Sequence, residues 1–386
     1  MSRISDLQLN VGRTIYKRHA QSLFDPIKIH PAEERRGFLA SFLYELEAFV
    51  LYALDDVVPA VPMLLRGADG AIKSNYNISG PQERYFNSLP TFIYVVQALS
   101  SHYDYNECVK VFIYCCTTLD LLEDKPIRLD LSAPAGSHAN PSVIAVTGDI
   151  FNELVLRIRS EWHRQGLSEK YRSRCREVGS RSQKYCNYER ALFEHNSRLL
   201  VIRVDLLYQR DIVDQISIKD AVIDFNHLIG NKRSNSIFKS MKGFVAKVEY
   251  AIDKGLYWHT IFFLDVTDAD QSSRVDFGKI IGEYWSSRVT KGRGAYWNEN
   301  HTVKRFYELE FRGSRIINAD EIEVRKHVRN AISCLCKTDQ CLRPKGSSRI
   351  RLIRKGHDPN ENQIKKKKNK SARPATMVKS PPSLES

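Results

Sequence analysis

Two side chains of one short stretch could share chemistry: the carboxylate of Glu249 and the imidazole of His259. Both lie in Gly243–Asp265, whose aromatic and β-branched residues predict two β-strands joined by a turn. A carboxylate beside an imidazole on a rigid hairpin can be an acid–base pair or half of a divalent-cation site. The alternative is a sheet histidine whose salt bridge only supports packing.

The turn decides whether these two side chains meet. A three-residue loop, Asp253–Gly255, would end on a glycine, which accepts the positive φ that such loops need. This loop pairs Ile252 with Leu256 and therefore Glu249 with His259, at about 5 Å between opposed side chains.

Tyr257 shares this face in the predicted register, opposite Ala251. A two-residue loop would pair Val248 with His259 instead and would separate the carboxylate from the imidazole.

Length and composition are those of a soluble protein. The 386 residues predict two domains plus tails, and 42% hydrophobic and 10% aromatic residues are ordinary values. The longest apolar stretches are too short to span a bilayer, and the N-terminus lacks the apolar core of a signal peptide, so we expect a cytoplasmic protein without a membrane partner. The eight cysteines include no CxxC pair, which favours buried reduced thiols over a zinc ribbon or a disulfide framework.

The net charge of +14 is unevenly spread. Residues 1–156 are net acidic, whereas residues 157–190 carry ten Lys and Arg against four Asp and Glu, and residues 345–386 carry twelve against three. Phosphate contacts are therefore expected in the C-terminal part of the chain.

Composition and periodicity divide the chain into five parts. They are a helical module of unknown role at 1–131, a Pro/Gly/Ser-rich linker at 132–148, a basic helical connector at 149–194, an α+β domain at 195–357 and a basic disordered tail at 358–386. Seven arginines of the connector, with three tyrosines between them, could grip a phosphate backbone while the aromatic rings stack on bases; a solvated connecting helix is the alternative. The arginines are Arg157, Arg159, Arg164, Arg172, Arg174, Arg176 and Arg181, and the tyrosines are Tyr171, Tyr185 and Tyr188.

The α+β domain begins with a predicted strand at 198–208. Leu200, Ile202, Val204 and Leu206 share one face, whereas Arg203 and Asp205 share the other, which marks an open or working surface. A helix at 218–229, ending at Gly230, comes before the hairpin. Together with the elements that follow, this order predicts one antiparallel sheet with helices packed on it.

After the hairpin we expect a helix that is capped by Ser272 or Ser273 and runs to about Arg288. The Gly-rich loop at 290–297 follows, where Lys291 and Arg293 could approach a phosphate closely. Strands at 306–311 and 315–318 lead to a helix at 320–335, with Lys337 just past its end. The tail adds Lys365, Lys366, Lys367 and Lys368, which would supply salt-sensitive affinity for nucleic acid.

Five sequence blocks resemble the YagK/YfjJ C-terminal domain family, which is similar to the gene II-type replication initiators of filamentous phages (inoviruses) and is common in prophages. The blocks are RVDLLY at 203–208, KVEYAIDKGLYWHTIFFLD at 247–265, IGEYW at 281–285, TKGRGAYWN at 290–298 and CLCKTDQCLR at 334–343. The resemblance covers about residues 195–357 and implies a domain like the HUH endonucleases of rolling-circle replication.

In such enzymes two histidines and a polar residue hold a divalent cation, and a tyrosine attacks the phosphodiester to form a covalent phosphotyrosine. A metal offsets phosphate charge, and the covalent intermediate conserves the bond for religation. Carried onto this chain, the resemblance implies Mg²⁺ or Mn²⁺ at His259 and Glu249, with Tyr284 as the nucleophile. Tyr257 stands at the first histidine position, where a phenol is a poor ligand because its pKa is about 10.

The same resemblance assigns DNA contacts to Arg288, beside Tyr284, and to Lys337 of the C-terminal helix block. Cys334 and Cys341 stand in that block where aromatic residues are expected. The leading hypothesis is a replication-initiator-like protein that nicks single-stranded or origin DNA. The second is a DNA-binding regulator that kept the fold and lost the metal site, and the third is an RNA-binding or interaction protein that works through its helical module.

Overall fold

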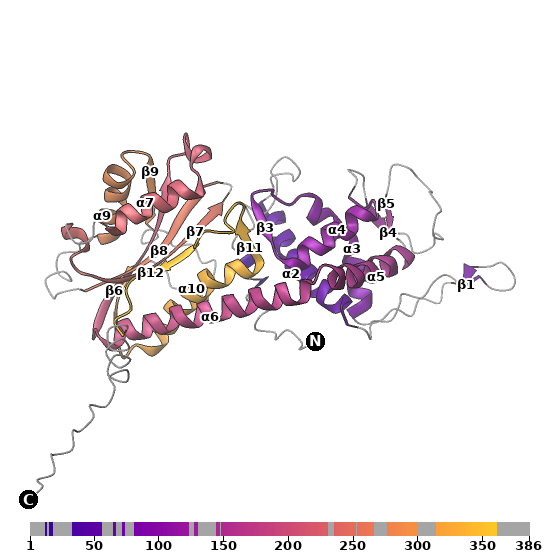
Figure 1. The fold of residues 1–386 in the computed structure, drawn as a ribbon, viewed down its shortest axis with the longest axis horizontal. Coiled ribbons are helices and arrows are strands. Elements are labelled where there is room, and N and C mark those ends of the chain that lie inside the picture. Colours follow the sequence, from indigo (N-terminus) through magenta and orange to yellow (C-terminus); the bar gives the residue numbers. More distant parts are fainter. Residues whose placement is uncertain are drawn as a thin grey trace, which may run out of the picture.

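The structure is a computed structural model, and it describes residues 12–13, 15–17, 33–55, 65–66, 72–73, 81–122, 127–129, 144–146, 148–230, 235–251, 253–265, 276–298 and 314–360. Over these residues the chain forms a helical N-terminal module and an antiparallel sheet with packed helices, connected by one long helix (Figure 1). The expected α+β fold class is confirmed. No helix in the described ranges is long and apolar enough to cross a membrane.

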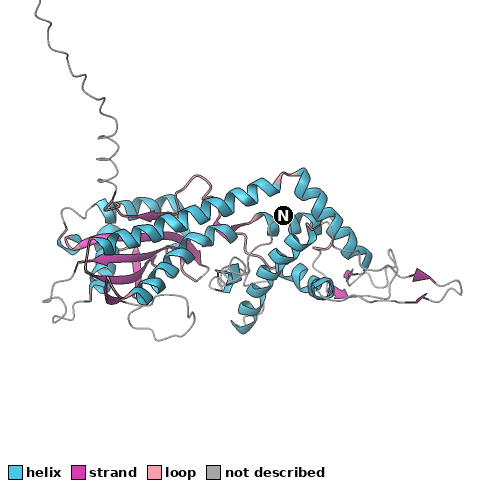
Figure 2. Ribbon diagram, turned by 90° about the horizontal axis from the view of Figure 1, so that it is seen from below, coloured by secondary structure: helices cyan, strands magenta, loops and turns pink. Residues whose placement is uncertain are grey.

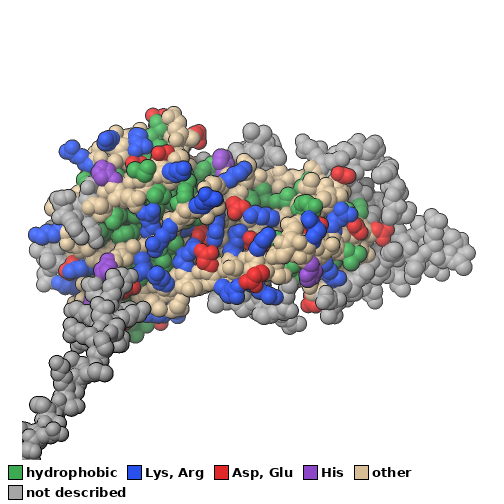
Figure 3. All heavy atoms as spheres, in the orientation of Figure 1, with side chains coloured by type: hydrophobic (Ala, Val, Ile, Leu, Met, Phe, Trp, Pro, Cys, Tyr) green, Lys and Arg blue, Asp and Glu red, His purple; other side chains and the backbone are tan. Residues whose placement is uncertain are grey.

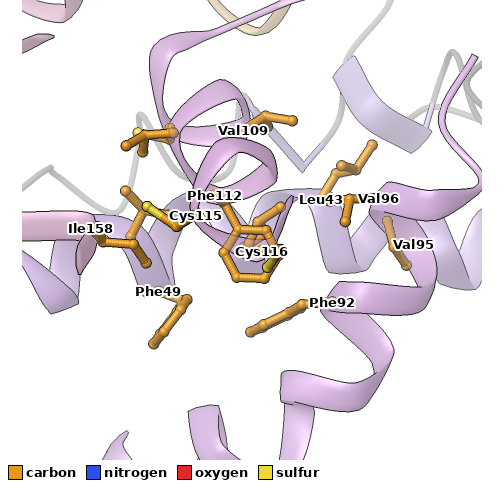
Figure 4. Close-up of a cluster of buried hydrophobic side chains, with 14 of the residues drawn as sticks. Leu43, Phe49, Phe92, Val95, Val96, Val109, Phe112, Cys115, Cys116 and Ile158 are labelled. Carbon is orange, nitrogen blue, oxygen red and sulfur yellow. The ribbon is translucent and has the colours of Figure 1, made fainter. Parts of the chain in front are cut away.

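The N-terminal module is organised around aromatic side chains that its helices bury together. The helices are α2 (Glu33–Ala53), α3 (Pro81–Gln97), α4 (Glu107–Thr118) and α5 (Gly148–Arg164). The centroid of the Phe49 ring lies 5.8 Å from those of the Phe92 and Phe151 rings and 6.1 Å from that of the Phe112 ring. Figure 4 shows Phe49, Phe92 and Phe112 together in this core. Such edge and offset contacts stabilise a core beyond the burial of area alone.

Short strands border this module: β1 (Leu65–Arg66) pairs with β2 (Ile72–Lys73), and β4 (Ile127–Leu129) pairs in parallel with β5 (Ile144–Val146). The expected linker at 132–148 lies largely outside the described residues. The expected connector at 149–194 is two helices, α5 and α6 (Leu167–Glu194), and α5 shares the core of the N-terminal module through side chains such as Phe151 and Trp162.

The sheet of the second domain has the order β10-β6-β8-β7-β12, with β9 also paired to β6, and all its pairs are antiparallel. Its strands are β6 (Arg198–Tyr208), β7 (Met241–Ala251), β8 (Gly255–Leu264), β9 (Gly294–Asn298), β10 (Ser314–Asn318) and β12 (Ile353–Lys355). The predicted strands at 198–208 and 315–318 are confirmed. The predicted strand at 306–311 lies outside the described residues.

Helices cover both faces of this sheet. One face carries α7 (Ile218–Gly230), α9 (Phe277–Tyr284) and the π-helical turn η4 (Trp285–Val289), with short 3-10 turns at Val213–Gln215 and Ser236–Phe238. The other carries α6 and α10 (Ile322–Cys341), which run beside each other along the sheet (Figure 2). Even-numbered residues of β6 face α7 and α9, and odd-numbered residues face α6 and α10.

Two predicted helix boundaries are wrong. The helix after the hairpin begins at Phe277 with Asp276 as its cap, and Ser272 and Ser273 lie outside the described residues. α10 continues to Cys341, so Lys337 lies within the helix and not past its end. All eight cysteines are free, and most of them are buried, as expected.

The chain after α10 returns to the N-terminal module. Strand β11 (Leu342–Pro344) pairs with β3 (Tyr103–Tyr105), the hydroxyl of Tyr103 donates to the carbonyl of Tyr250 at 2.8 Å, and the His102 ring stacks on the Tyr250 ring. These contacts fix the helical module against the turn end of the hairpin.

Candidate nucleic-acid interface

The β7–β8 hairpin has a different register from the expected one. Glu249 pairs with Tyr257, and Lys247 pairs with His259, so each partner is displaced by two residues. Gly255 does take the positive φ, at 63°, but it already belongs to β8 and pairs with Ala251. A side chain there would also collide with Val213. Because the displacement is an even number of residues, Glu249 and His259 still share one face of the sheet.

The imidazole of His259 finds its carboxylate on the neighbouring strand. Asp205 is directly opposite it on β6, with 2.8 Å between His259 Nδ1 and Asp205 Oδ1. Lys254 Nζ lies 3.2 Å from the other oxygen of Asp205. Burial alone would raise the pKa of Asp205, but the charges of His259, Lys254 and Arg203 hold it well below its usual range.

Glu249 belongs to a neighbouring set of contacts, which meets the first where Lys254 Nζ lies over the Tyr257 ring, 5.1 Å from its centroid. The hydroxyl of Tyr257 donates to Glu249 Oε2 at 3.1 Å, and Lys247 Nζ lies 3.8 Å from Glu249 Oε1. Lys247 also lies 2.8 Å from Asp339 on α10, and Arg181 of α6 lies 2.5 Å from the other oxygen of Asp339. An ionic network therefore runs from the hairpin through α10 to α6.

The carboxylates of this network, together with Lys247 and His259, are almost completely withdrawn from water, whereas the side chains of Lys254 and Arg181 are 33% and 20% exposed. Lys247, Glu249, His259 and Asp339 are all 2% exposed or less, and Asp205 is 3% exposed. Buried charges of this kind persist only when they are paired, because removing an ion from water costs several kcal/mol. The network, which we call the buried ionic network, comprises Arg181, Asp205, Lys247, Glu249, Lys254, Tyr257, His259 and Asp339.

The donors that the family resemblance implies do not fit a divalent cation in this arrangement. A metal needs lone pairs that face a common point away from other cations. Here an ammonium group approaches each carboxylate, Lys247 at Glu249 and Lys254 at Asp205, and His259 Nδ1 faces Asp205. A doubly charged ion placed among them would be repelled by two lysines.

Tyr284 does not join Glu249 and His259. It lies at the end of α9, and its ring packs edge-on against Phe238 in the core of the opposite face of the sheet. The sheet thus separates the expected nucleophile from the expected metal ligands. Local sequence does not predict this separation, because a helix that follows a long loop can pack on either face.

The expected DNA contacts are scattered. Arg203, a candidate DNA contact on a face that was expected to be open, is 6% exposed and buried in the domain. Arg288 and Lys291 are exposed on the α7 and α9 side, and Arg293 there is held by Asp224 at 3.0 Å. Lys337 is half-buried on α10. The lysines at 365–368 lie outside the described residues.

The tyrosines of the basic connector do not form a stacking surface. Tyr171, Tyr185 and Tyr188 are each less than a tenth exposed, because they point into the cores that α6 helps to build. Several of the arginines are also engaged: Arg174 lies 2.9 Å from Glu107, and Arg181 belongs to the buried ionic network.

A basic groove nevertheless lies along α6. Its middle is a hollow of about 530 Å³ between α6, the end of α10 and the segment that leads to β12. A second hollow adjoins it through Glu177 and Arg343, and a third through Arg351. Together, the three hollows are lined by nine basic and three acidic residues. They are Glu169, Lys170, Arg174, Glu177, Arg181, Lys184, Asp339, Arg343, Arg349, Arg351, Arg354 and Lys355.

Figure 3 shows many Lys and Arg side chains across the middle of the face that it draws, with Asp and Glu side chains among them. Lys184, Arg349 and Arg351 are exposed and form no ion pair with any described residue, and Ser347 and Ser348 add hydroxyl groups beside them. Serine hydroxyls and unpaired cations suit phosphate oxygens. The run of basic residues at 349–355 is the signal of this groove in the sequence.

The floor of the groove and the buried ionic network share two residues. Arg181 and Asp339 line the middle hollow and also carry the contact to Lys247 on the sheet. The hairpin thus supports the wall of the groove from below, through one continuous set of charges.

No protein-family model, curated protein or solved structure matches this chain.

Proposed function

We propose that this protein binds DNA along the basic groove, as a replication-initiator-like prophage protein in which the hairpin supports the groove and does not cut the strand. This is the DNA-binding regulator of the second hypothesis. The observation that carries it is the groove itself, three adjoining hollows, two of them along α6, that are lined by three times as many basic as acidic side chains.

The physics of phosphate binding supports the proposal. Cations that face a hollow without carboxylate partners are free to displace the counterions of a nucleic acid, and this release supplies sequence-independent affinity. Lys184, Arg349 and Arg351 meet this condition on both sides of the groove. The net positive charge of the chain adds long-range attraction.

The buried ionic network supports a structural role for the hairpin. A general base or metal ligand must reach the reacting phosphate, whereas His259 and Glu249 are each 2% exposed and engaged by residues on neighbouring strands. The network ties the sheet to α10 and α6, and those helices form the groove. The residues proposed for catalysis thus hold the binding surface in shape.

Fluorescence anisotropy with a labelled 30-nucleotide DNA tests the proposal. The triple variant Lys184→Ala/Arg349→Ala/Arg351→Ala should bind roughly 100-fold more weakly, and the slope of log affinity against log salt should fall by about 3, because each lost phosphate contact removes about one unit. Replacing the three cations should leave the fold intact, because they are exposed.

The matched control is Arg288→Ala/Lys291→Ala, which removes two exposed cations from the opposite face of the sheet. It should leave affinity within about twofold of that of the unmodified protein, since only non-specific attraction is reduced. Equal losses in both variants would reject the groove as the binding surface. Tighter binding of an RNA of the same sequence would reject DNA as the ligand.

An assay for nicking separates the regulator from the endonuclease. The protein is incubated with labelled single-stranded DNA and Mn²⁺ and examined for an adduct that survives SDS. We expect none from the unmodified chain. An adduct that disappears in His259→Ala would restore the nickase hypothesis, and an adduct gained in Tyr257→His would show that only the missing ligand had limited the metal site.

A further inference from the structure

The third hollow of the groove differs in chemistry from the other two. It has a volume of about 500 Å³ and lies beyond the edge strand β12, between α7 and the first residues of β7. It is lined by Phe225, Asn226, Ile229 and Gly230 of α7, Phe244 of β7, and Arg351, Arg354 and Lys355. Pockets that bind small ligands in other proteins have volumes of about 300–1,000 Å³, so this hollow is large enough to bind one.

The inner wall of this hollow is apolar and rigid. The Phe225 ring stacks on Trp258 with 4.1 Å between centroids, and it meets Phe244 edge-on at 5.7 Å. Trp258 is itself fixed, because its indole nitrogen donates to the carbonyl of Ala221 at 2.8 Å. Ile229 is half-buried beside them, and Gly230 presents bare backbone.

The outer wall is basic. The guanidinium of Arg354 lies over Trp258, with 5.8 Å from its central carbon to the ring centroid, and it donates to the side-chain oxygen of Asn226. Its Nε is buried and has no hydrogen-bond partner among the described residues. Arg351 stands at the junction with the middle hollow, where it donates to the hydroxyl of Tyr185 at 3.3 Å.

The positive charges of Arg351 and Arg354 repel each other. Burial and the like charge of Arg351 together lower the pKa of Arg354, which means that its positive charge is disfavoured where it stands. An anion between the two guanidinium groups would relieve this repulsion and would accept hydrogen bonds from both. A phosphate group has this shape and charge.

We infer that this hollow is a subsite for one unpaired nucleotide of the bound DNA, with its phosphate between Arg351 and Arg354 and its base against the apolar wall. This inference rests on the proposed function. The exposed amide of Asn226, which can both donate and accept, lies at the rim, where it can meet the polar edge of the base.

The subsite predicts that the protein prefers single strands. A base within a duplex is stacked and paired, and its edges face the opposite strand, so it enters a side hollow only after it is unstacked at a cost of a few kcal/mol. A base in a single strand carries no such cost. Contacts of one base with a protein wall change affinity by about tenfold or more.

The test compares a 30-nucleotide single strand with a duplex of the same sequence in four proteins. The unmodified chain should bind the single strand roughly tenfold more tightly. Arg354→Met, which keeps an unbranched side chain over Trp258, and Asn226→Ala, at an exposed position, should each remove most of this preference. The control Lys170→Met, at the far end of the groove, should weaken both ligands equally.

The outcomes separate this inference from the proposal on which it rests. Equal affinity for both ligands, or a preference that survives Arg354→Met and Asn226→Ala, would overturn the subsite and leave DNA binding standing. Failure to bind either ligand would overturn the proposed function. A second readout uses single strands that carry 4-thiothymidine: crosslinks at residues 225–230 or at Phe244 support the subsite, and their restriction to α6 rejects it.

Discussion

Each half of the molecule buries carboxyl groups, and the two halves accommodate them by different means. In the N-terminal module Glu47 is 6% exposed and is held by neutral donors, the hydroxyl of Tyr16 at 2.5 Å and the amide of Asn106. On the α6 and α10 face of the sheet, Asp205 and Asp339 are held by lysine, arginine and histidine.

The consequence is that the two kinds of buried acid titrate in opposite directions. Burial raises the pKa of Glu47 to about 7, although both hydrogen bonds and the charge of Arg174 oppose the rise. The pKa of Asp339 is lowered despite its burial, because Lys247 and Arg181 are close to it. Burial alone therefore does not decide the charge of an acid; the nature of its neighbours does.

The largest expected effect is the loss of a central carboxylate. Asp339→Ala leaves Lys247 and Arg181 buried without their counter-ion, and we expect the free energy of unfolding to fall by about 3–5 kcal/mol. Urea denaturation followed by the fluorescence of Trp258 and Trp285, both fully buried in this domain, measures the change.

Two further variants test whether the loss of stability comes from the buried charges that Asp339→Ala leaves behind. The double variant Asp339→Leu/Lys247→Met should recover part of the lost stability, because it replaces the buried ion pair by apolar groups, whereas Glu249 and Arg181 each still lose one partner. Ile93→Val in the apolar core of the N-terminal module should cost only about 1 kcal/mol. A loss for Asp339→Ala no greater than that for Ile93→Val would mean that the network contributes little.

The next expected effect is on the pH dependence of stability, which should differ between Glu47 and the carboxylates of the buried ionic network. The pKa of Glu47 in the folded state is raised above the unfolded value, so its stabilising contribution is fully present below about pH 4.5 and is lost as the pH rises to about 7. A shift of this size corresponds to about 3 kcal/mol. Glu47→Gln should therefore lower the dependence of unfolding free energy on pH between 5 and 8.

The control for this prediction is Glu153→Gln, which changes an exposed carboxylate of α5 that is paired with Arg157. It should leave the pH dependence unchanged, because surface pairs are worth less than about 1 kcal/mol. A pH profile that Glu47→Gln does not alter would show that other groups titrate in this range.

Local patterns in the sequence predicted the elements, and the parts that failed depend on distant contacts. The alternation along β6 and the apolar periodicity of α7 were sufficient for both elements, whose bounds are close to those expected. The hairpin was located correctly, and its two-residue displacement kept Glu249 and His259 on one face. A shift of one residue would have separated them.

Two facts about the site could not be read from local sequence. The partner of His259 is Asp205, more than fifty residues away, and only the pairing of β6 with β8 brings them together. The face that α9 covers decides the position of Tyr284, and that choice is made by packing against Phe238 and its neighbours. Arg203 and Asp205, expected to mark an open face, are instead covered.

The smallest of the three expected effects concerns Asp205 and His259, which are far apart in the sequence but in contact in the fold. Asp205→Asn keeps the shape of the side chain but removes its charge from between His259 and Lys254, and we expect a loss of about 2 kcal/mol at pH 7, the usual value for a hydrogen bond to a charged group. The pKa of Asp205 is depressed in the folded protein, so its contribution is present above the unfolded value of about 3.9 and is lost as the pH falls below it.

The difference in stability between Asp205→Asn and the unmodified chain should therefore shrink on acidification below about pH 4, which is the opposite trend to that of Glu47. Asp253→Asn, an exposed position in the adjacent turn, serves as the control and should change stability by less than about 0.5 kcal/mol at any pH. If acidification instead widened the difference for Asp205→Asn, the carboxylate would be protonated in the folded protein, and the cationic environment assigned to this face of the sheet would be wrong.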